Sequence, residues 1–143
     1  MSEFSKINQV KLTNTISAFA WISNTKFIYS VWLDQNLFIY DKDAQNKKFE
    51  VINSSTYYTA LFVYNNVCYC GNGQDLTIDI LDLKEEKIKK DGFGLGEICE
   101  TIISDISVFE NTMHILCKSK KKNLPQINQF GQKISDIRDR ITL

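Results

Sequence analysis

The stretch KFIYSVWLDQNLFIYD, residues 26–41, decides the fold. Two runs of aromatic and β-branched residues, 26–32 and 36–40, lie on either side of Asp34-Gln35. Aromatic and β-branched side chains pack well on a pleated, half-buried surface, whereas Asp is typical of turns. The stretch therefore predicts two antiparallel strands joined by a tight turn.

Runs of the same kind continue along the chain in groups of four. The first group is 16–22, 26–32, 36–40 and 48–52; the second is 57–63, 66–70, 76–81 and 86–90; the third is 105–109, 112–117, 124–129 and 132–137. Polar segments rich in Asn, Asp, Ser and Gly separate the runs, as is typical of turns. The sequence therefore predicts an all-β protein.

The three groups repeat one another. The first run of each group ends near Trp21, Phe62 or Val108, and Tyr40-Asp41 and Leu81-Asp82 close the third run of the first two groups. In WD40 repeats, whose period is about 40–45 residues, the Trp-Asp dipeptide stands at this position. Here an aromatic or aliphatic residue followed by Asp takes its place. Four short antiparallel strands per repeat are the plan of a β-propeller blade.

The repeat predicts a single WD40-like β domain over residues 1–143, with about three four-stranded blades at roughly 14–53, 56–92 and 98–138. Three blades do not close a ring, because propellers have about 4–8. We therefore expect a partial, open β-propeller. Such a chain is a fragment, a truncated gene product, half of an oligomer, or a module that a partner completes.

Composition excludes several classes of function. The chain has 143 residues, 43% of them hydrophobic, which is enough for a packed core. Lys+Arg and Asp+Glu are 17 each, which argues against binding of nucleic acid or anionic lipid through bulk charge. No apolar run approaches the ~20 residues of a membrane span, and the first residues lack the apolar stretch of a signal peptide. We expect an intracellular protein.

Several segments resemble the WD40-repeat family, in particular the N-terminal blades of its mitotic-checkpoint (Bub-kinase partner) and Rae-type messenger-RNA export branch. They are Ile16-Ser17, Ser30–Asp41, Thr59–Phe62, Tyr69–Leu76, Ile80–Leu83 and Leu95–Cys99. This sequence departs from the family where Leu33 separates Trp32 from Asp34. The resemblance implies a top face that binds a short motif of a kinase or nucleoporin, with Trp32 and Asp34 near that face. The location in the nucleus or cytoplasm is expected only from the missing signal peptide and the missing membrane-spanning run.

Residues that could carry chemistry are sparse. His114 is the only histidine, and we interpret it as an ordinary strand residue. Cys68 and Cys70 face one side of a strand, without the paired spacing of a zinc site, and we interpret all four cysteines as small buried side chains. Residues 92–97 have the wrong spacing for a nucleotide loop and predict a connection between blades. The basic run 118–122 predicts a solvated loop, with contact to phosphates or to an acidic partner as the alternative. We expect no enzyme, cofactor or metal.

The aromatic residues divide into two predicted sets. Those that alternate with smaller residues are expected in the core: Trp21, Phe27, Tyr29, Phe38, Tyr40 and Phe49. Trp32, Tyr57 and Tyr58 are expected on an exposed rim, with Asp34, because aromatic anchors dominate binding energy.

These features predict a non-enzymatic scaffold that docks short motifs of larger proteins. The alternative is a structural subunit whose open propeller is completed by self-association or by a partner's blades.

Overall fold

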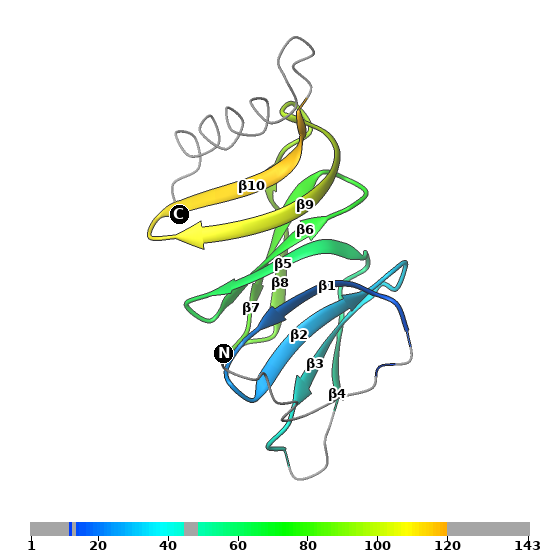
Figure 1. The fold of residues 1–143 in the computed structure, drawn as a ribbon, viewed down its shortest axis with the longest axis vertical. Coiled ribbons are helices and arrows are strands. Elements are labelled where there is room, and N and C mark those ends of the chain that lie inside the picture. The colour runs from blue at the N-terminus through cyan, green and yellow to red at the C-terminus, as the bar shows by residue number, and fades with distance from the viewer. Residues whose placement is uncertain (1–11, 13, 45–48, 120–143) are drawn as a thin grey trace, which may run out of the picture.

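The computed structural model describes residues 12, 14–44 and 49–119, and every helix or strand in them is a β-strand. Sheet 1 contains β1 (Ile16–Trp21), β2 (Lys26–Val31), β3 (Asn36–Asp41) and β4 (Phe49–Asn53). Sheet 2 contains β5 (Tyr58–Tyr64), β6 (Val67–Asn72), β7 (Thr77–Asp82) and β8 (Lys87–Gly94), and β9 (Cys99–Phe109) pairs with β10 (Thr112–Ser119) as a hairpin. All pairs are antiparallel, and each sheet follows the chain order (Figure 1).

The predicted all-β class is confirmed, and so are the four runs of the first two groups. In the third group β9 begins at Cys99, earlier than the predicted start at residue 105. The predicted runs 124–129 and 132–137 lie outside the described residues.

The residue that closes the third strand of each four-stranded sheet has the same role in both. Asp41 accepts a hydrogen bond from the backbone of Asp43 at 3.0 Å. Asp82 accepts from the backbones of Glu85 (3.1 Å) and Lys84 (2.8 Å), and these bonds lower the pKa of its carboxyl group. The repeated Asp thus holds the turn that leads into the fourth strand.

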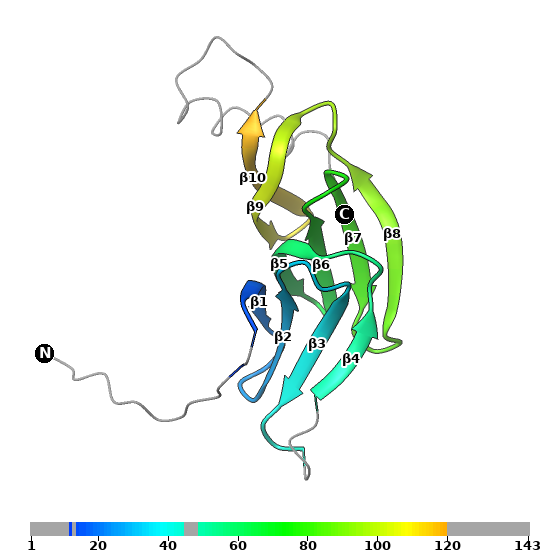
Figure 2. The same cartoon turned by 90° about the vertical axis from the view of Figure 1, so that its right-hand side faces the viewer.

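The sheets stack along their first strands, so that β1, β5 and β9 lie side by side (Figures 1 and 2). Ser17 Oγ donates to the carbonyl of Tyr58 at 2.7 Å, and Thr59 Oγ1 donates to the carbonyl of Ile103 at 2.6 Å. These two bonds join the early part of each first strand to the next. Such an arrangement is compatible with propeller blades.

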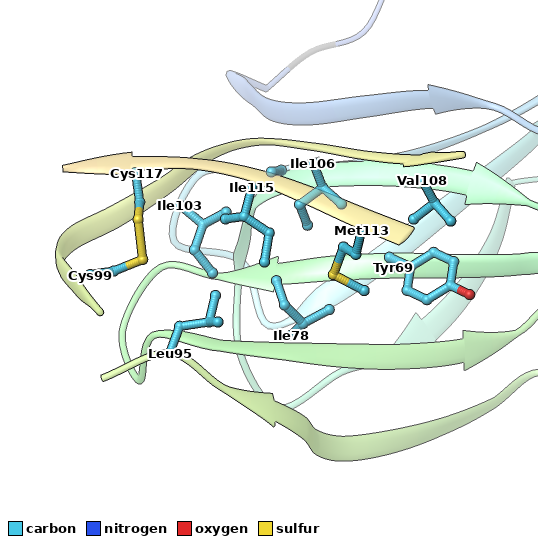
Figure 3. Close-up of a cluster of buried hydrophobic side chains, with 11 residues drawn as sticks. Tyr69, Ile78, Leu95, Cys99, Ile103, Ile106, Val108, Met113, Ile115 and Cys117 are labelled. Atoms are coloured by element: carbon cyan, nitrogen blue, oxygen red, sulfur yellow. A yellow bond between two sulfur atoms is a disulfide. The ribbon is translucent and has the colours of Figure 1, made fainter. Parts of the chain in front are cut away.

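Two apolar layers separate the stacked units. The central core, between sheets 1 and 2, contains Ile28, Leu37, Ile39, Ile52, Tyr58, Leu61, Cys68, Cys70 and Leu81. The hairpin core, between sheet 2 and the β9–β10 hairpin, contains Ala60, Tyr69, Ile78, Leu95, Cys99, Ile103, Ile106, Val108, Met113, Ile115 and Cys117 (Figure 3). Sheet 2 is therefore buried on both faces.

Cys99 and Cys117 are joined by a disulfide at one end of the hairpin core (Figure 3). The interpretation of all four cysteines as free, small side chains is therefore wrong for this pair and holds for Cys68 and Cys70, which are buried thiols. Sequence spacing did not reveal the pair, because the bond depends on β10 folding back on β9 and bringing the two Cα atoms to 5.8 Å.

Strand register shows which positions of the two sheets correspond. Phe27 pairs with the residue before Asp41, and Cys68 pairs with the residue before Asp82. Since Trp21 pairs with Phe27 and Val63 pairs with Cys68, Trp21 corresponds to Val63. The predicted alignment of Trp21 with Phe62 is one residue off, and a one-residue offset exchanges the two faces of a strand.

Candidate protein-interaction surface

Three connecting segments meet at one end of the sheets. They are the β2–β3 turn (32–35), the β4–β5 link (54–57) and the β6–β7 turn (73–76), and we call them together the rim. The backbones of Ser54 and Ser55 donate to the carbonyl of Gln35 at 3.0 and 3.2 Å, so the link is fixed to the first turn.

An aromatic pair dominates the rim. The rings of Trp32 and Tyr57 lie 5.3 Å apart with a 55° tilt, and Trp32 remains 48% exposed. The pair joins a turn of sheet 1 to the strand entry of sheet 2. Segments 14–15 and 31–35 line an open depression that includes the Trp32 side chain.

Leu33 projects from the same turn and is 68% exposed. Its φ of 62° lies in the left-handed region, where a side chain without a local hydrogen bond is unfavourable. The residue that departs from the WD40 pattern therefore adds an exposed apolar side chain to the rim, and it occupies a strained backbone position there.

Asp34 is half-buried beside these side chains. Its backbone donates to the carbonyl of Val31 at 3.1 Å, and its Oδ1 accepts from Asn36 Nδ2 at 2.8 Å. One carboxylate oxygen is thus engaged in holding the turn. The acidic group lies next to an apolar anchor, a combination that favours a partner with both apolar and basic groups.

The β6–β7 turn supports Tyr57 from the other side. Asn72 Oδ1 accepts from the backbones of Gln74 (2.8 Å) and Asp75 (3.2 Å), which fixes the turn. A Cβ atom at Gly73 would lie 3.0 Å from the Tyr57 ring and 2.8 Å from Thr59 Cγ2. Gly73 therefore allows the close approach of the Tyr57 ring, a role that its sequence context alone did not reveal.

Tyr58 is fully buried, so the prediction that it lies on the exposed rim is wrong. Adjacent residues of an extended segment point to opposite sides, and Tyr58 takes the inward side while Tyr57 stays half-buried. The Tyr58 hydroxyl donates to Asp79 Oδ2 at 2.7 Å. Burial, then the charges of Cys70 and Asp79 and the hydrogen bond to Asp79, raise the pKa of Tyr58 well above its ordinary value.

Lys90 completes this buried cluster from β8. Its Nζ donates to Asp79 Oδ2 at 3.0 Å, to the Tyr58 hydroxyl at 3.1 Å and to the carbonyl of Ser54. The Asp79 side chain is wholly buried. Lys90 thus holds the β4–β5 link from behind, and sequence analysis missed it because the contact joins residues 36 positions apart.

The other predicted residues are not brought to the rim. His114 is half-buried in β10, opposite Ser107. Cys68 and Cys70 are buried, with their Sγ atoms 3.7 Å apart. Of the basic run, Lys118 pairs with Glu100 at 3.2 Å, whereas residues 120–122 lie outside the described part.

The predicted aromatic core is partly confirmed. Phe27, Tyr29 and Tyr40 are buried and Phe38 is half-buried, whereas the side chain of Phe49 lies outside the description. The core prediction is wrong for Trp21, which is 58% exposed at the end of β1, although Phe27 and Tyr29 on the same side of the sheet are buried.

Within the described residues, no group of three or more His, Cys, Asp and Glu is placed to hold a metal ion. The described part also has no helix with the length and apolar character needed to cross a membrane.

Neither a model of a known protein family nor a curated protein matches the sequence. Among solved structures, the chain is similar to the computationally designed Ika4 protein, with 12% identity and a TM-score of 0.45, over 81% of this chain and 94% of that one. It is also similar to the computationally designed Ika8 protein, with 14% identity and a TM-score of 0.40, over 72% of this chain and 43% of that one.

Proposed function

We propose that this chain is a non-enzymatic interaction module, built of WD40-like propeller blades, that docks a short segment of a larger protein on the rim. The observation that supports the proposal most is the exposed Trp32 ring set against Tyr57, with Leu33 beside it. Exposed aromatic anchors on a rigid support contribute most of the energy in many interfaces, and turns held by strands are where such anchors usually lie.

The rim also favours a particular chemistry in its partner. Segments 32–35, 54–57 and 73–76 contain Asp34 and Asp75 and no Lys, Arg or His. We expect an extended segment that places a large apolar side chain against Trp32 and a Lys or Arg near Asp34. The resemblance to the checkpoint and RNA-export branch makes a kinase or a nucleoporin the first partner to test.

Affinity capture tests this function with the tagged full-length chain in its own cells. The wild type and two variants, Trp32→Ala and Phe109→Ala, are compared, and bound segments are identified by mass and remade as synthetic peptides. Phe109 is a matched control because it is an exposed aromatic residue at the end of β9, away from the rim.

We expect Trp32→Ala to weaken binding of the peptide at least about tenfold, equivalent to about 1.4 kcal/mol, and Phe109→Ala to leave it unchanged. Equal binding by all three chains would refute the rim as the docking surface. Far-UV circular dichroism of each variant confirms that the sheets are intact.

A location in the nucleus or cytoplasm belongs to the same proposal. Disulfides are rare in those compartments, so the Cys99–Cys117 bond counts against this location and gives it a direct test. Imaging of the tagged chain, combined with thiol alkylation in the living cell, tests the location. A chain confined to the secretory pathway would contradict it.

The second candidate function, an assembly subunit, is supported by a different observation. The face of sheet 1 that points away from sheet 2 is apolar, and no other sheet of the described residues packs on it. An open array with such a face is expected to associate with another chain.

A further inference from the structure

The outer face of sheet 1, opposite the central core, is built of aromatic and aliphatic side chains. We call it the aromatic face; it contains Phe19, Trp21, Phe27, Tyr29, Val31, Phe38, Tyr40 and Val51. Neighbouring rings are in contact, with centroids 5.0 Å apart for Phe19–Phe27, 5.1 Å for Phe27–Tyr40 and 5.2 Å for Tyr29–Phe38. The rings form a continuous layer across β1, β2 and β3.

Part of this layer is open to solvent. Phe27, Tyr29 and Tyr40 are buried, but Trp21 and Val51 are 58% and 57% exposed. Leu12 packs on the layer from the chain before β1. By contrast, the outer face of sheet 2 is covered by the whole β9–β10 hairpin. An apolar face of this kind on one sheet marks an interaction site.

Charge distinguishes the possible occupants. None of the side chains that form the aromatic face is charged. The outward face of the hairpin, which a head-to-tail neighbour would present, carries the half-exposed Lys118–Glu100 ion pair. Covering that pair with an aromatic layer would remove two charges from water without new partners, which is unfavourable. The aromatic face of a second copy has no such penalty.

We propose that the aromatic face binds the same face of a second copy of this chain, forming a twofold dimer in which the two copies of sheet 1 stack. A twofold interface is self-complementary, so each copy supplies the same patch. Two sheets that stack face to face lie about 10 Å apart, with the side chains of both inner faces between them. The rim segments lie beyond the ends of the strands, and Val31 is the residue of the aromatic face that also lines the depression at the rim.

The mass of the full-length chain in solution tests the dimer. Sedimentation over about 1 to 100 µM is expected to give twice the chain mass of 16.5 kDa at the upper concentrations. Two variants place a charge on the exposed part of the aromatic face, Trp21→Glu and Val51→Lys. Leu116→Glu is the control, because it places the same charge as Trp21→Glu on the exposed side of the hairpin.

We expect both aromatic-face variants to raise the dimer dissociation constant at least about tenfold and Leu116→Glu to leave it unchanged. A wild-type monomer over the whole range would overturn the proposal. So would a series of larger masses, or a dimer that only Leu116→Glu dissociates, because both indicate head-to-tail contact. Val51→Lys at the sheet edge keeps the test valid if Trp21→Glu unfolds. Peptide binding at the rim is read separately, since Trp32→Ala should not change the mass.

Discussion

Corresponding positions on the two four-stranded sheets carry side chains of very different size. Where sheet 1 has Phe27 and Tyr29, sheet 2 has Cys68 and Cys70, in the same register relative to the closing Asp. The small thiols belong to the central core, where sheet 1 packs directly on sheet 2. The large rings lie on the aromatic face, on which no other sheet of the described residues packs. The same strand arrangement therefore accepts large aromatic or small side chains at these positions. The size of the side chain depends on whether another sheet packs on that face.

The largest change in the free energy of unfolding is expected when a side chain is shortened on the covered outer face of sheet 2 rather than on the outer face of sheet 1. Ile78→Ala opens a cavity between sheet 2 and the hairpin, because Ile78 is fully buried, and should lower the free energy of unfolding by about 3 kcal/mol. Phe19→Ala on the aromatic face should lower it by about 1 kcal/mol, since its ring is partly exposed. Urea unfolding at a concentration where the chain is monomeric measures both. Equal losses would mean that the two faces are equally covered.

Removing the disulfide should weaken the hairpin that covers the outer face of sheet 2, whereas no hairpin of the described residues covers the outer face of sheet 1. The bond closes a loop with a sequence separation of 18, so the double variant Cys99→Ala/Cys117→Ala should lose about 3 kcal/mol of stability. Urea unfolding measures the loss, and reductant should destabilise the wild type but not the variant. An unchanged wild type in reductant would show that the hairpin is held by packing alone.

A comparison of two lysines tests the contacts of Lys90 with Asp79, Tyr58 and Ser54. Lys90→Met removes the Lys90 ammonium from the buried Asp79 carboxylate and from the Ser54 carbonyl, and should cost about 2 kcal/mol of stability. Lys87→Met, which removes a largely exposed pair with Glu85, should cost less than about 0.5 kcal/mol. Thermal unfolding of the two variants measures both losses of stability. Similar losses would contradict a stabilising contact between Lys90 and the buried Asp79.

Alkaline pH should lower the stability that the buried Tyr58 hydroxyl contributes. Burial raises the pKa of Tyr58 above its ordinary value of 10.0, so the folded chain keeps this hydroxyl protonated while the unfolded chain ionises it. Its contribution is complete below about pH 10 and is lost as the pH rises further. Urea midpoints between about pH 8 and 11 should fall, and those of Tyr58→Phe should fall less. Parallel curves would show that Tyr58 does not control the decline.

The smallest effect is expected at the rim. Leu33→Gly relieves the left-handed backbone position and should raise stability by about 0.5 kcal/mol, while removing an apolar side chain from the docking surface. Paired measurements of thermal stability and of binding to the captured peptide should move in opposite directions. Binding that is unchanged would place Leu33 outside the contact.

The sequence predicts the strands well because alternation and turn residues act locally. The hairpin 26–41 and the matching positions of Asp41 and Asp82 could be predicted directly, whereas the hydrogen bonds that these two residues accept came from the structure. The side of the sheet to which a single side chain points could not be predicted in the same way. Whether Tyr57 or Tyr58 points inward depends on where sheet 2 meets sheet 1, and the cluster that holds Tyr58 joins β5, β7 and β8. The WD40 resemblance and the partner stay predictions.

The order of contacts has a consequence for how such a chain can change during evolution. Sheet 1 contacts sheet 2, and sheet 2 contacts the hairpin, but sheet 1 and the hairpin share no contact in the described residues. Because each unit meets only its neighbours, a duplication that added one unit between existing joints would leave the outermost faces as they are. The aromatic face could therefore be inherited as a fixed terminus while the number of units behind it varied.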